Sequence, residues 1–382
     1  MPINATHDMF PDANHDEQSR QHFIRSIKVH IAGKVMPGND VLYRDRVVPS
    51  FKKRLGRGPQ TRREVREALA QEPFNQMWSA MLRTSQEMMY DTVRPSIERQ
   101  LPDLVARAKK KYSGKLGSVT LDAKVEIPSY HTAVDIHCKP GAYHTEMVDD
   151  NDILAGAEFD RTLHLYFMGQ AGPNNDDMGA SGGAWLKKTF PNFKPKRILD
   201  MGCTIGNSTL AWADAFPDAE VHGIDLGAAS LRYAHARAES LGHRVHFSQQ
   251  NAERTDFPAG HFDIVASAVL LHETSSPAIA AILRESRRLL RPGGVMCHVD
   301  VPQVEGDAFD LFIPDWDTYN NNEPFMGLMR DTDIAKLAQG AGFSRYFHGD
   351  APVVRKQTKT GVTFRGGEGK KGKPWHVYGA VA

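Results

Sequence analysis

The sequence predicts an α/β protein in which a mostly helical N-terminal part precedes a doubly wound, mostly parallel sheet. From residue 196 onward, short apolar runs alternate with helical patterns, which is typical of parallel strands joined by crossover helices. Before residue 112, apolar residues instead recur at helical spacing. The chain has 382 residues, more than one hydrophobic core usually serves, so we expect two domains.

The N-terminal part carries several helix and turn signals. Thr61 and Glu64 have the spacing of a capping box, and a stripe of Met, Trp and Leu side chains follows at helical spacing. The predicted elements are a polar, frayed tail over residues 1–20, an amphipathic helix Arg20–Val35, a loop Pro37–Asp40, a short helix from Thr61, a long helix Phe74–Val93 and helices broken at Pro95 and Pro102.

The spacing of apolar residues then changes to every second position. Apolar and polar residues alternate from Val119 to Ile127, as they do in a half-buried strand. The following segment is rich in His, Tyr, Gly, Asn and Asp and is typical of a connector. We therefore predict a mostly helical domain over residues 1–128, a connector and candidate lid over 129–181, and a sheet domain over 182–382.

The composition bears on the class of protein. The formal net charge of +1 gives no global reason to expect nucleic acid or a membrane as partner. The longest apolar run, Ile264–Leu271, is too short to cross a bilayer, and we see no charged-then-apolar leader, so we expect a cytoplasmic protein. Cys138, Cys203 and Cys297 have neither a disulfide framework nor a zinc spacing, so we expect buried free thiols.

One strand–turn–helix segment carries the chemistry. Arg197–Asp200 is predicted to be a short buried strand that turns into a helix Leu210–Phe216, and a second strand, Glu220–Ile224, ends in Asp225. Glycines at such a turn let the backbone approach a ligand, and the helix N-terminus offers unpaired N–H groups. An acid at the end of the next strand suits a ribose diol. Together these features predict a nucleoside-binding site.

A dinucleotide-binding site is the first alternative. Counted from Gly202, its glycine fingerprint requires glycines where Thr204 and Asn207 stand. Asp200 also lies directly ahead of the turn, where a dinucleotide-binding strand normally continues apolar. An acid at that position could instead hold an ammonium group. The segment therefore favours adenosine joined to a cationic group over a dinucleotide.

These residues resemble the class I S-adenosylmethionine-dependent methyltransferases, especially the ubiquinone/menaquinone-biosynthesis group, in their Asp-x-Gly-Cys-x-x-Gly loop. The resemblance covers the second half of the chain. It implies a Rossmann-like, seven-stranded doubly wound sheet with S-adenosyl-L-methionine as cofactor. In that family the loop contacts the methionine part of the cofactor, and the acid after the second strand contacts the ribose. Thr204 stands where the family usually has a glycine.

Later motifs follow in the family's order. Phe262–Val265 resembles the fourth strand, Val269–Glu273 the segment that faces the methyl group, and Leu289–Gly294 the turn into the fifth strand. Asn251 replaces an Asp that often contacts adenine, and its side-chain oxygen can still accept a hydrogen bond. The cofactor-binding residues that the resemblance implies are Asp200, Gly202, Cys203, Thr204, Gly206, Asp225, Leu226, Asn251, Ala252 and Val269.

His272, Glu273 and Asp300 are the candidate catalytic residues. The resemblance places the first two in the substrate pocket, and Asp300 ends the predicted fifth strand. Imidazole titrates near neutral pH and suits a general base for an oxygen acceptor. Two simpler interpretations stay open: His272 hydrogen-bonds its own loop, and Glu273 supplies a favourable negative charge at the start of the next helix. We predict no metal site.

We expect a small-molecule methyl acceptor and favour O-methylation. His131, His137, Tyr143 and His144 lie where family members often carry a lid, and they lack a convincing metal-ligand spacing. Segment 302–330 is rich in aromatic residues, which either wall an apolar substrate or pack on the N-terminal domain; we favour the wall.

Other functions stay open. The basic stretch Arg44–Arg66 makes an RNA methyltransferase the competing enzyme class, although no RNA-binding fold signature precedes it. A non-catalytic S-adenosylmethionine-binding protein is a further alternative. A homodimer through the N-terminal domain is a candidate assembly, and the Gly-rich basic loop Arg355–Lys373 is predicted to be a flexible hairpin between the last two strands.

Overall fold

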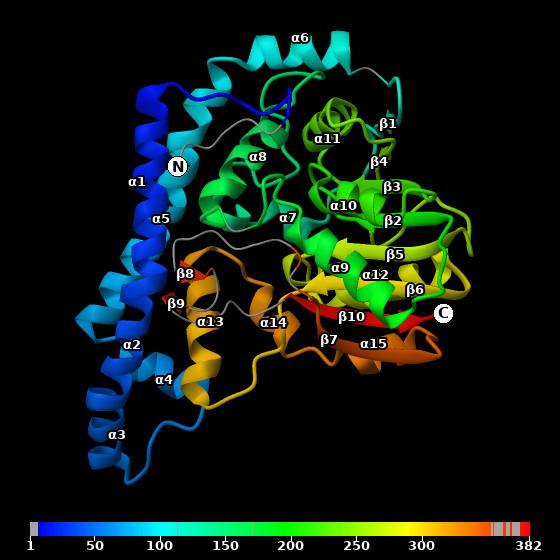
Figure 1. The fold of residues 1–382 in the computed structure, drawn as a ribbon. Coiled ribbons are helices and arrows are strands. Elements are labelled where there is room, and N and C mark those ends of the chain that lie inside the picture. Colours follow the sequence, from blue (N-terminus) through cyan, green and yellow to red (C-terminus); the bar gives the residue numbers. More distant parts are fainter. Residues whose placement is uncertain are drawn as a thin grey trace.

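The computed structural model of this chain describes residues 7–112, 114–169, 171–352, 354, 362–363, 367–368 and 375–382. Its centre is an eight-stranded sheet with the order β1-β4-β3-β2-β5-β6-β10-β7, parallel except for β10, which runs antiparallel to both neighbours (Figure 1). The strands of this sheet are β1 (Ser118–Thr120), β2 (Arg197–Met201), β3 (Glu220–Asp225), β4 (His246–Gln249), β5 (Phe262–Ala268), β6 (Leu290–Asp300), β7 (Arg345–Asp350) and β10 (His376–Val381).

Helices cover both faces of the sheet. Successive residues of a strand point to opposite faces, and the neighbours Ile198 and Leu199 of β2 accordingly belong to two different apolar clusters. One cluster includes Trp212, and the other includes Ile282. The helices of this part are α9 (Asp177–Thr189), α10 (Asn207–Ala215), α11 (Ala228–Ser240), a short 3₁₀ helix (Leu271–Glu273), α12 (Ser276–Leu289), α13 (Ala308–Asn320), α14 (Met326–Arg330) and α15 (Ile334–Gly340).

The N-terminal helices form a separate layer beside the sheet. Helices α1 and α5 run side by side at a distance from the strands, and α8 packs between α5 and α11 (Figure 1). The elements of this layer are α1 (His15–His30), a π-helical turn (Ile31–Val35), α2 (Met36–Leu42), a second π-helical turn (Tyr43–Val47), α3 (Val48–Leu55), α4 (Arg62–Leu69), α5 (Pro73–Glu98), α6 (Leu101–Lys111), α7 (Ser129–Thr132), a short 3₁₀ turn (Ile136–Cys138) and α8 (Leu154–Tyr166).

The sheet has one strand more than the seven that the sequence predicted. Strand β1 pairs in parallel with β4 at the sheet edge and is three residues long, so most of the predicted strand Val119–Ile127 is not extended. Packing fixes this edge. A side chain at Gly117 would place its Cβ 2.0 Å from the Val245 carbonyl oxygen, and the Glu239 carboxylate accepts a hydrogen bond from the Gly117 N–H.

Two N-terminal predictions are wrong. Residues 7–14, which fall within the predicted frayed tail, are anchored: Met9 is fully buried, and His7 Nε2 lies 2.9 Å from Asp160 Oδ2. The predicted loop Pro37–Asp40 lies within α2, where proline is tolerated in the first helical turn. A Cβ on Gly38 would lie 2.5 Å from the Phe74 ring, so the close approach of two helices explains this glycine. Residues 1–6 lie outside the described residues.

The predicted break at Pro95 is also wrong, because α5 continues through this residue to Glu98. Other predictions hold. Thr61 caps α4 by accepting a hydrogen bond from the Glu64 N–H. Of the predicted stripe on α5, Trp78 and Met89 are buried and Met77 is exposed. All three cysteines are free and buried. Of the predicted hairpin Arg355–Lys373, the structure describes only the paired strands β8 (Val362–Thr363) and β9 (Gly367–Glu368); its remainder lies outside the described residues. The three domain boundaries stay a prediction.

No helix in the described part of the chain is long and apolar enough to span a membrane.

Candidate active site

A glycine-containing loop joins β2 to α10 at the carboxyl end of the sheet. Gly202 has φ of +67°, and a Cβ at that position would lie 2.7 Å from Leu270 Cδ1, so both backbone conformation and space favour glycine. Thr204 adopts φ of +47° without being a glycine. Such strain in a residue with a side chain is frequent where a loop is shaped for a ligand. Thr204 therefore adopts the backbone conformation that this position requires, although the family usually has a glycine there.

Asp200 lies beneath this loop with one carboxylate oxygen unpartnered. Its Oδ2 accepts a hydrogen bond of 2.6 Å from the Thr209 hydroxyl, whereas Oδ1 is buried and has no partner. Burial raises the pKa of Asp200 to about 7, and the nearby Asp225 adds to the rise while the Thr209 hydrogen bond opposes it. An ammonium group would give Oδ1 a donor and restore the charged carboxylate. This unsatisfied oxygen supports the predicted role of Asp200.

Asp225 connects the end of β3 to the loop. Its Oδ2 accepts from the Thr204 N–H at 2.9 Å, and its Oδ1 accepts from the Gly227 N–H at 2.8 Å. Burial raises the pKa of Asp225, and these backbone donors lower it. A carboxylate has about four lone-pair sites, so two of them stay available for the hydroxyls of a ribose.

The remaining predicted cofactor residues also meet at this pocket. Every residue in the predicted cofactor set lines the pocket except Gly206, which stands at the start of α10. Asn251 Oδ1 accepts from the Glu253 N–H at 2.8 Å, so it is already partly engaged. Val269 adopts φ of +53°, rare for a β-branched residue, and its N–H donates to the Val299 carbonyl. The cofactor-binding residues predicted from the sequence, apart from Gly206, therefore lie together and form one half of the pocket.

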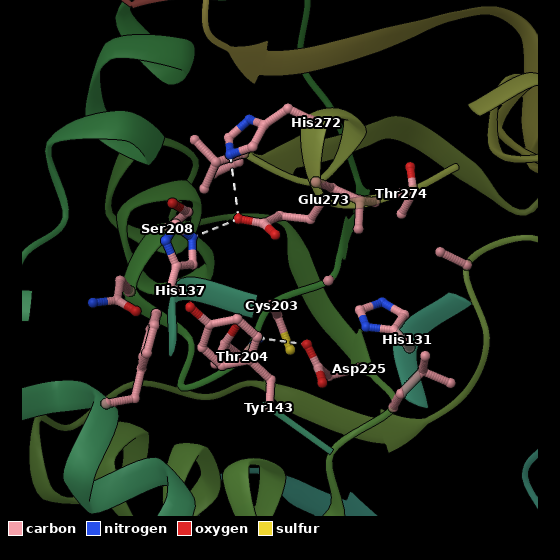
Figure 2. A pocket seen from close by; sticks show the side chains of 18 of the residues that line it. His131, His137, Tyr143, Cys203, Thr204, Ser208, Asp225, His272, Glu273 and Thr274 are labelled. Carbon is pink, nitrogen blue, oxygen red and sulfur yellow. Dashed lines mark hydrogen bonds and ion pairs between the residues drawn. The ribbon is translucent and has the colours of Figure 1, made fainter. Parts of the chain in front are cut away.

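The other half contains a chain of alternating acidic and histidine side chains. His272 Nδ1 donates to Asp300 Oδ1, and His272 Nε2 lies 3.3 Å from Glu273 Oε1. The same Glu273 oxygen lies 2.7 Å from His137 Nε2. His137 Nδ1 in turn lies 3.1 Å from Glu323 Oε1. Figure 2 shows the Glu273 carboxylate between the two imidazole rings, across the pocket from Asp225.

These contacts decide the protonation of both histidines. Burial alone disfavours the imidazolium form, but the neighbouring carboxylates outweigh it and raise the pKa of His137 and of His272 to about 10. The pKa of Glu273 is lowered, since the two imidazolium groups outweigh its burial. At neutral pH both histidines are therefore cationic and Glu273 is ionised.

The catalytic candidates differ in their access to the pocket. His272 and Glu273 line it, whereas Asp300 is fully buried behind His272 and accepts hydrogen bonds from the Leu271 and Val301 N–H groups. The Glu273 carboxylate contacts His137 and His272, while Ser275 caps α12. A favourable charge of Glu273 near the start of α12 stays a prediction.

The walls of this half come from segments far apart in the chain. His131, His137, Tyr143 and His144 all line the pocket, and the role of this segment as a lid stays a prediction. The Tyr130 hydroxyl also donates to Glu253 Oε1 at 2.8 Å, which links the lid to the cofactor half. Aromatic lining residues that the sequence analysis did not single out as site residues are Tyr90, Tyr130, Phe159, Tyr166, Phe167 and Trp375.

Segment 302–330 does not form the aromatic wall that we expected. Phe309 stacks on Tyr43 with ring centroids 4.4 Å apart, and Trp316 Nε1 donates to the Ser79 hydroxyl. These aromatic side chains therefore pack on the N-terminal helices. The segment contributes Glu323 to the pocket instead, an acidic residue that had no recognisable signal in the sequence.

The basic stretch Arg44–Arg66 is largely engaged within the molecule. Arg62 forms ion pairs with Asp331 and Asp315, and Arg66 lies over the rings of Trp316 and Tyr319. These contacts attach α4 to α13 and α14. Lys52, Lys53 and Arg54 of the same stretch stay exposed on α3.

In the described part of the chain, no group of three or more His, Cys, Asp or Glu side chains has an arrangement that could hold a metal ion.

Comparison with known proteins places the first half of the pocket in a family. Residues 198–294 match the family described as "Methyltransferase domain". The matched segment contains Asp200, Asp225 and Val269 but ends before Asp300. The residues that complete the acid–histidine chain, His137 and Glu323, also lie outside the match.

Three curated methyltransferases are similar to parts of this chain. A demethylmenaquinone methyltransferase of Thermus thermophilus is 35% identical over 117 residues, which cover 31% of this chain and 52% of that protein. A ubiquinone biosynthesis O-methyltransferase of Bordetella bronchiseptica is 32% identical over 112 residues (29% and 44%). Phosphoethanolamine N-methyltransferase 3 of Arabidopsis thaliana is 30% identical over 142 residues (35% and 28%). The chain thus spans about half or less of the length of these relatives.

Proposed function

We propose that this protein transfers the methyl group of S-adenosyl-L-methionine to a small-molecule acceptor, with oxygen as the favoured acceptor atom. The observation that supports the proposal is that Asp225, the loop between β2 and α10, and the Glu273 carboxylate line one pocket. A methyl donor and an acceptor must meet in line, so both halves must open onto one space.

The cofactor half provides specific partners for each part of the cofactor. Asp200 Oδ1 would accept from the amino group, and the free lone pairs of Asp225 would accept from the ribose hydroxyls. Asn251 and Ala252 would lie along the adenine edge. When bound, the cofactor supplies an electrophilic methyl group on a sulfonium ion. The residues of this chain bind it, orient it and exclude water.

Glu273 is the group best placed to act on the acceptor. Its Oε2 is buried and has no hydrogen-bond partner, so a hydroxyl of the acceptor can donate to it and pass its proton there as the methyl–oxygen bond forms. His272 cannot accept a proton at neutral pH, because it is already an imidazolium. His272 and Asp300 therefore act as positioning residues for Glu273, and this revises the role that we expected for His272.

Two observations bear on the alternatives. The relatives named above include both an O- and an N-methyltransferase, and a carboxylate at Glu273 could take a proton from either kind of acceptor. An RNA substrate would need an open cationic surface, whereas the basic stretch pairs internally and the pocket is walled by aromatic side chains. A homodimer through the N-terminal domain stays a prediction, which light scattering of the purified protein would check.

Labelled-methyl transfer tests the proposal directly. Thermal unfolding is first measured with S-adenosyl-L-methionine, S-adenosylhomocysteine and NADH, since a ligand that binds only the folded state raises the melting temperature. The protein is then incubated with isotopically labelled cofactor and either a small-metabolite extract or total RNA. We expect stabilisation by the first two ligands and label in a small product. Stabilisation by NADH alone, or RNA as the better acceptor, would contradict the proposal.

A further inference from the structure

The acceptor half of the pocket contains acidic side chains but no strongly basic ones. Among the described residues that line the pocket, none is a lysine or an arginine. Its imidazolium groups at His137 and His272 are already paired with carboxylates. A phosphate or carboxylate on the acceptor would thus enter a site that offers it no free cation. The charges of the site therefore disfavour the binding of anionic acceptors.

Glu323 gives the site an excess of negative charge. Its side chain is 2% exposed, its Oε1 contacts His137 Nδ1, and its Oε2 has no hydrogen-bond partner. His137 lies between Glu323 and Glu273, so one positive charge faces two carboxylates. His272 does not correct this imbalance, because Asp300 holds its other nitrogen. A buried carboxylate oxygen without a donor is costly unless a ligand supplies one.

Lys28 and Arg330 interact with the charge of Glu323 at longer range: burial lowers the pKa of each cation, and Glu323 opposes that lowering. The Lys28 ammonium donates to Gln86 Oε1 at 2.7 Å and lies 5.5 Å from the centre of the Tyr166 ring. Arg330 pairs with Asp315. Neither cation lines the pocket or forms an ion pair with Glu323 in the described part of the chain. Glu323 itself lines the pocket, and its Oε2 has no hydrogen-bond partner.

Aromatic rings complete the surroundings of this carboxylate. The Tyr166 hydroxyl donates to Glu323 Oε1 at 3.5 Å. The rings of Tyr166 and Tyr143 lie edge-on to His137, with ring centroids 5.4 and 6.1 Å away. Aromatic faces attract cations, most strongly where water is excluded. A carboxylate among aromatic side chains is a recurrent way to bind an ammonium group.

We propose that the acceptor is an amine-bearing molecule whose ammonium group binds Glu323 among these tyrosines. The inference rests on the proposed function, because it names the class of acceptor for the same pocket. It places the ammonium at Glu323 and the methyl-accepting atom at Glu273, one on each side of His137. Acceptors that carry a phosphate or a carboxylate in place of the amine are excluded by the same charges.

Three probes of similar shape and different charge test this inference. Tyramine, 4-ethylphenol and 3-(4-hydroxyphenyl)propanoate share a phenol and end in an ammonium, an ethyl group and a carboxylate. Their binding to the full-length protein saturated with S-adenosylhomocysteine is measured by calorimetry. We expect tyramine to bind at least about tenfold more tightly than 4-ethylphenol, and the carboxylate probe to bind most weakly.

A charge-neutralising variant assigns the effect to one residue. Glu323→Gln should remove the tyramine preference while leaving the affinity for 4-ethylphenol within about twofold. Glu305→Gln, the same change at an exposed residue of the same segment, should keep the preference. Unchanged affinity for S-adenosylhomocysteine in both variants shows that the fold is retained.

The two proposals fail in different ways. If S-adenosylhomocysteine does not bind the wild-type protein, the proposed function is wrong and the inference falls with it. If S-adenosylhomocysteine binds but tyramine does not bind more tightly than the other probes, or if Glu323→Gln retains the preference, only the amine-bearing acceptor is overturned.

Discussion

The two halves of the pocket are built in different ways. The cofactor half is mostly local: Asp200, the glycine loop and Asp225 lie within one strand–turn–helix–strand unit, and backbone N–H groups hold the carboxylates in place. The acceptor half is assembled from distant segments, and the His137 side chain contacts those of Glu273 and Glu323. On the proposed function, the first half would serve many acceptors with one cofactor, whereas the second half would set the acceptor.

Replacing Glu273 by glutamine should produce the largest effect and separate the two halves. Glutamine keeps the shape of the side chain but cannot accept the proton, so we expect turnover to fall by about 10²–10⁴-fold. The affinity for S-adenosylhomocysteine, measured by calorimetry, should change by less than about twofold, because the cofactor half is untouched. Full turnover in this variant would show that Glu273 is not the proton acceptor.

Asp225→Ala tests the cofactor half, because it should change the affinity for the cofactor product. The change removes two backbone hydrogen bonds and the proposed ribose contacts, and hydrogen bonds to charged groups contribute about 1.5–3 kcal/mol each. We expect the affinity for S-adenosylhomocysteine to fall at least about tenfold. Asp256→Asn, at an exposed residue after β4, is the control and should bind normally. Equal affinities would mean that Asp225 does not contact the ligand.

The acid–histidine chain should make stability depend on pH. His137 and His272 have pKa values of about 10 in the folded state, against about 6.5 in the unfolded chain. The folded state therefore keeps protons that the unfolded state has lost between these values, so stability is full below about pH 6.5 and falls as the pH rises towards 10. Each histidine contributes a slope of about 1.4 kcal/mol per pH unit in this window.

Denaturant unfolding over this pH range measures that slope. The variant His272→Gln should lose less stability than the wild type between pH 7 and 10, since it has one raised histidine fewer. Parallel pH profiles for the two proteins would show that His272 is not protonated in the folded state.

The smallest effect on turnover is expected from substitutions outside both halves of the pocket. Lys52, Lys53 and Arg54 lie exposed on α3 and take no part in the pocket. Their joint replacement by alanine should leave turnover on the acceptor found in the labelled-methyl screen within about twofold, because screened surface charges contribute little to a distant enclosed site. A large loss of activity would return the basic stretch to consideration as a binding surface for an anionic substrate.

The local sequence pattern was enough to predict most of the sheet and the cofactor half of the pocket. Strands and helices alternate with characteristic periods, and the Asp200–Asp225 unit is short enough for its geometry to follow from its own sequence. The same holds for the Thr61 cap and the long helix α5. In each case the contacts that define the element lie within a few residues of one another.

Tertiary packing decided the rest. Gly38 and Pro37 indicate a turn when taken alone, yet they lie in a helix because α2 packs against Phe74. The aromatic residues of segment 302–330 have no intrinsic preference between a substrate and the N-terminal helices, and only the fold chose the latter. Glu323 contacts His137, although the two residues lie far apart in the sequence. A local pattern contains no information about such a contact, because its energy arises only when the folded chain brings the two charges together and excludes water from them.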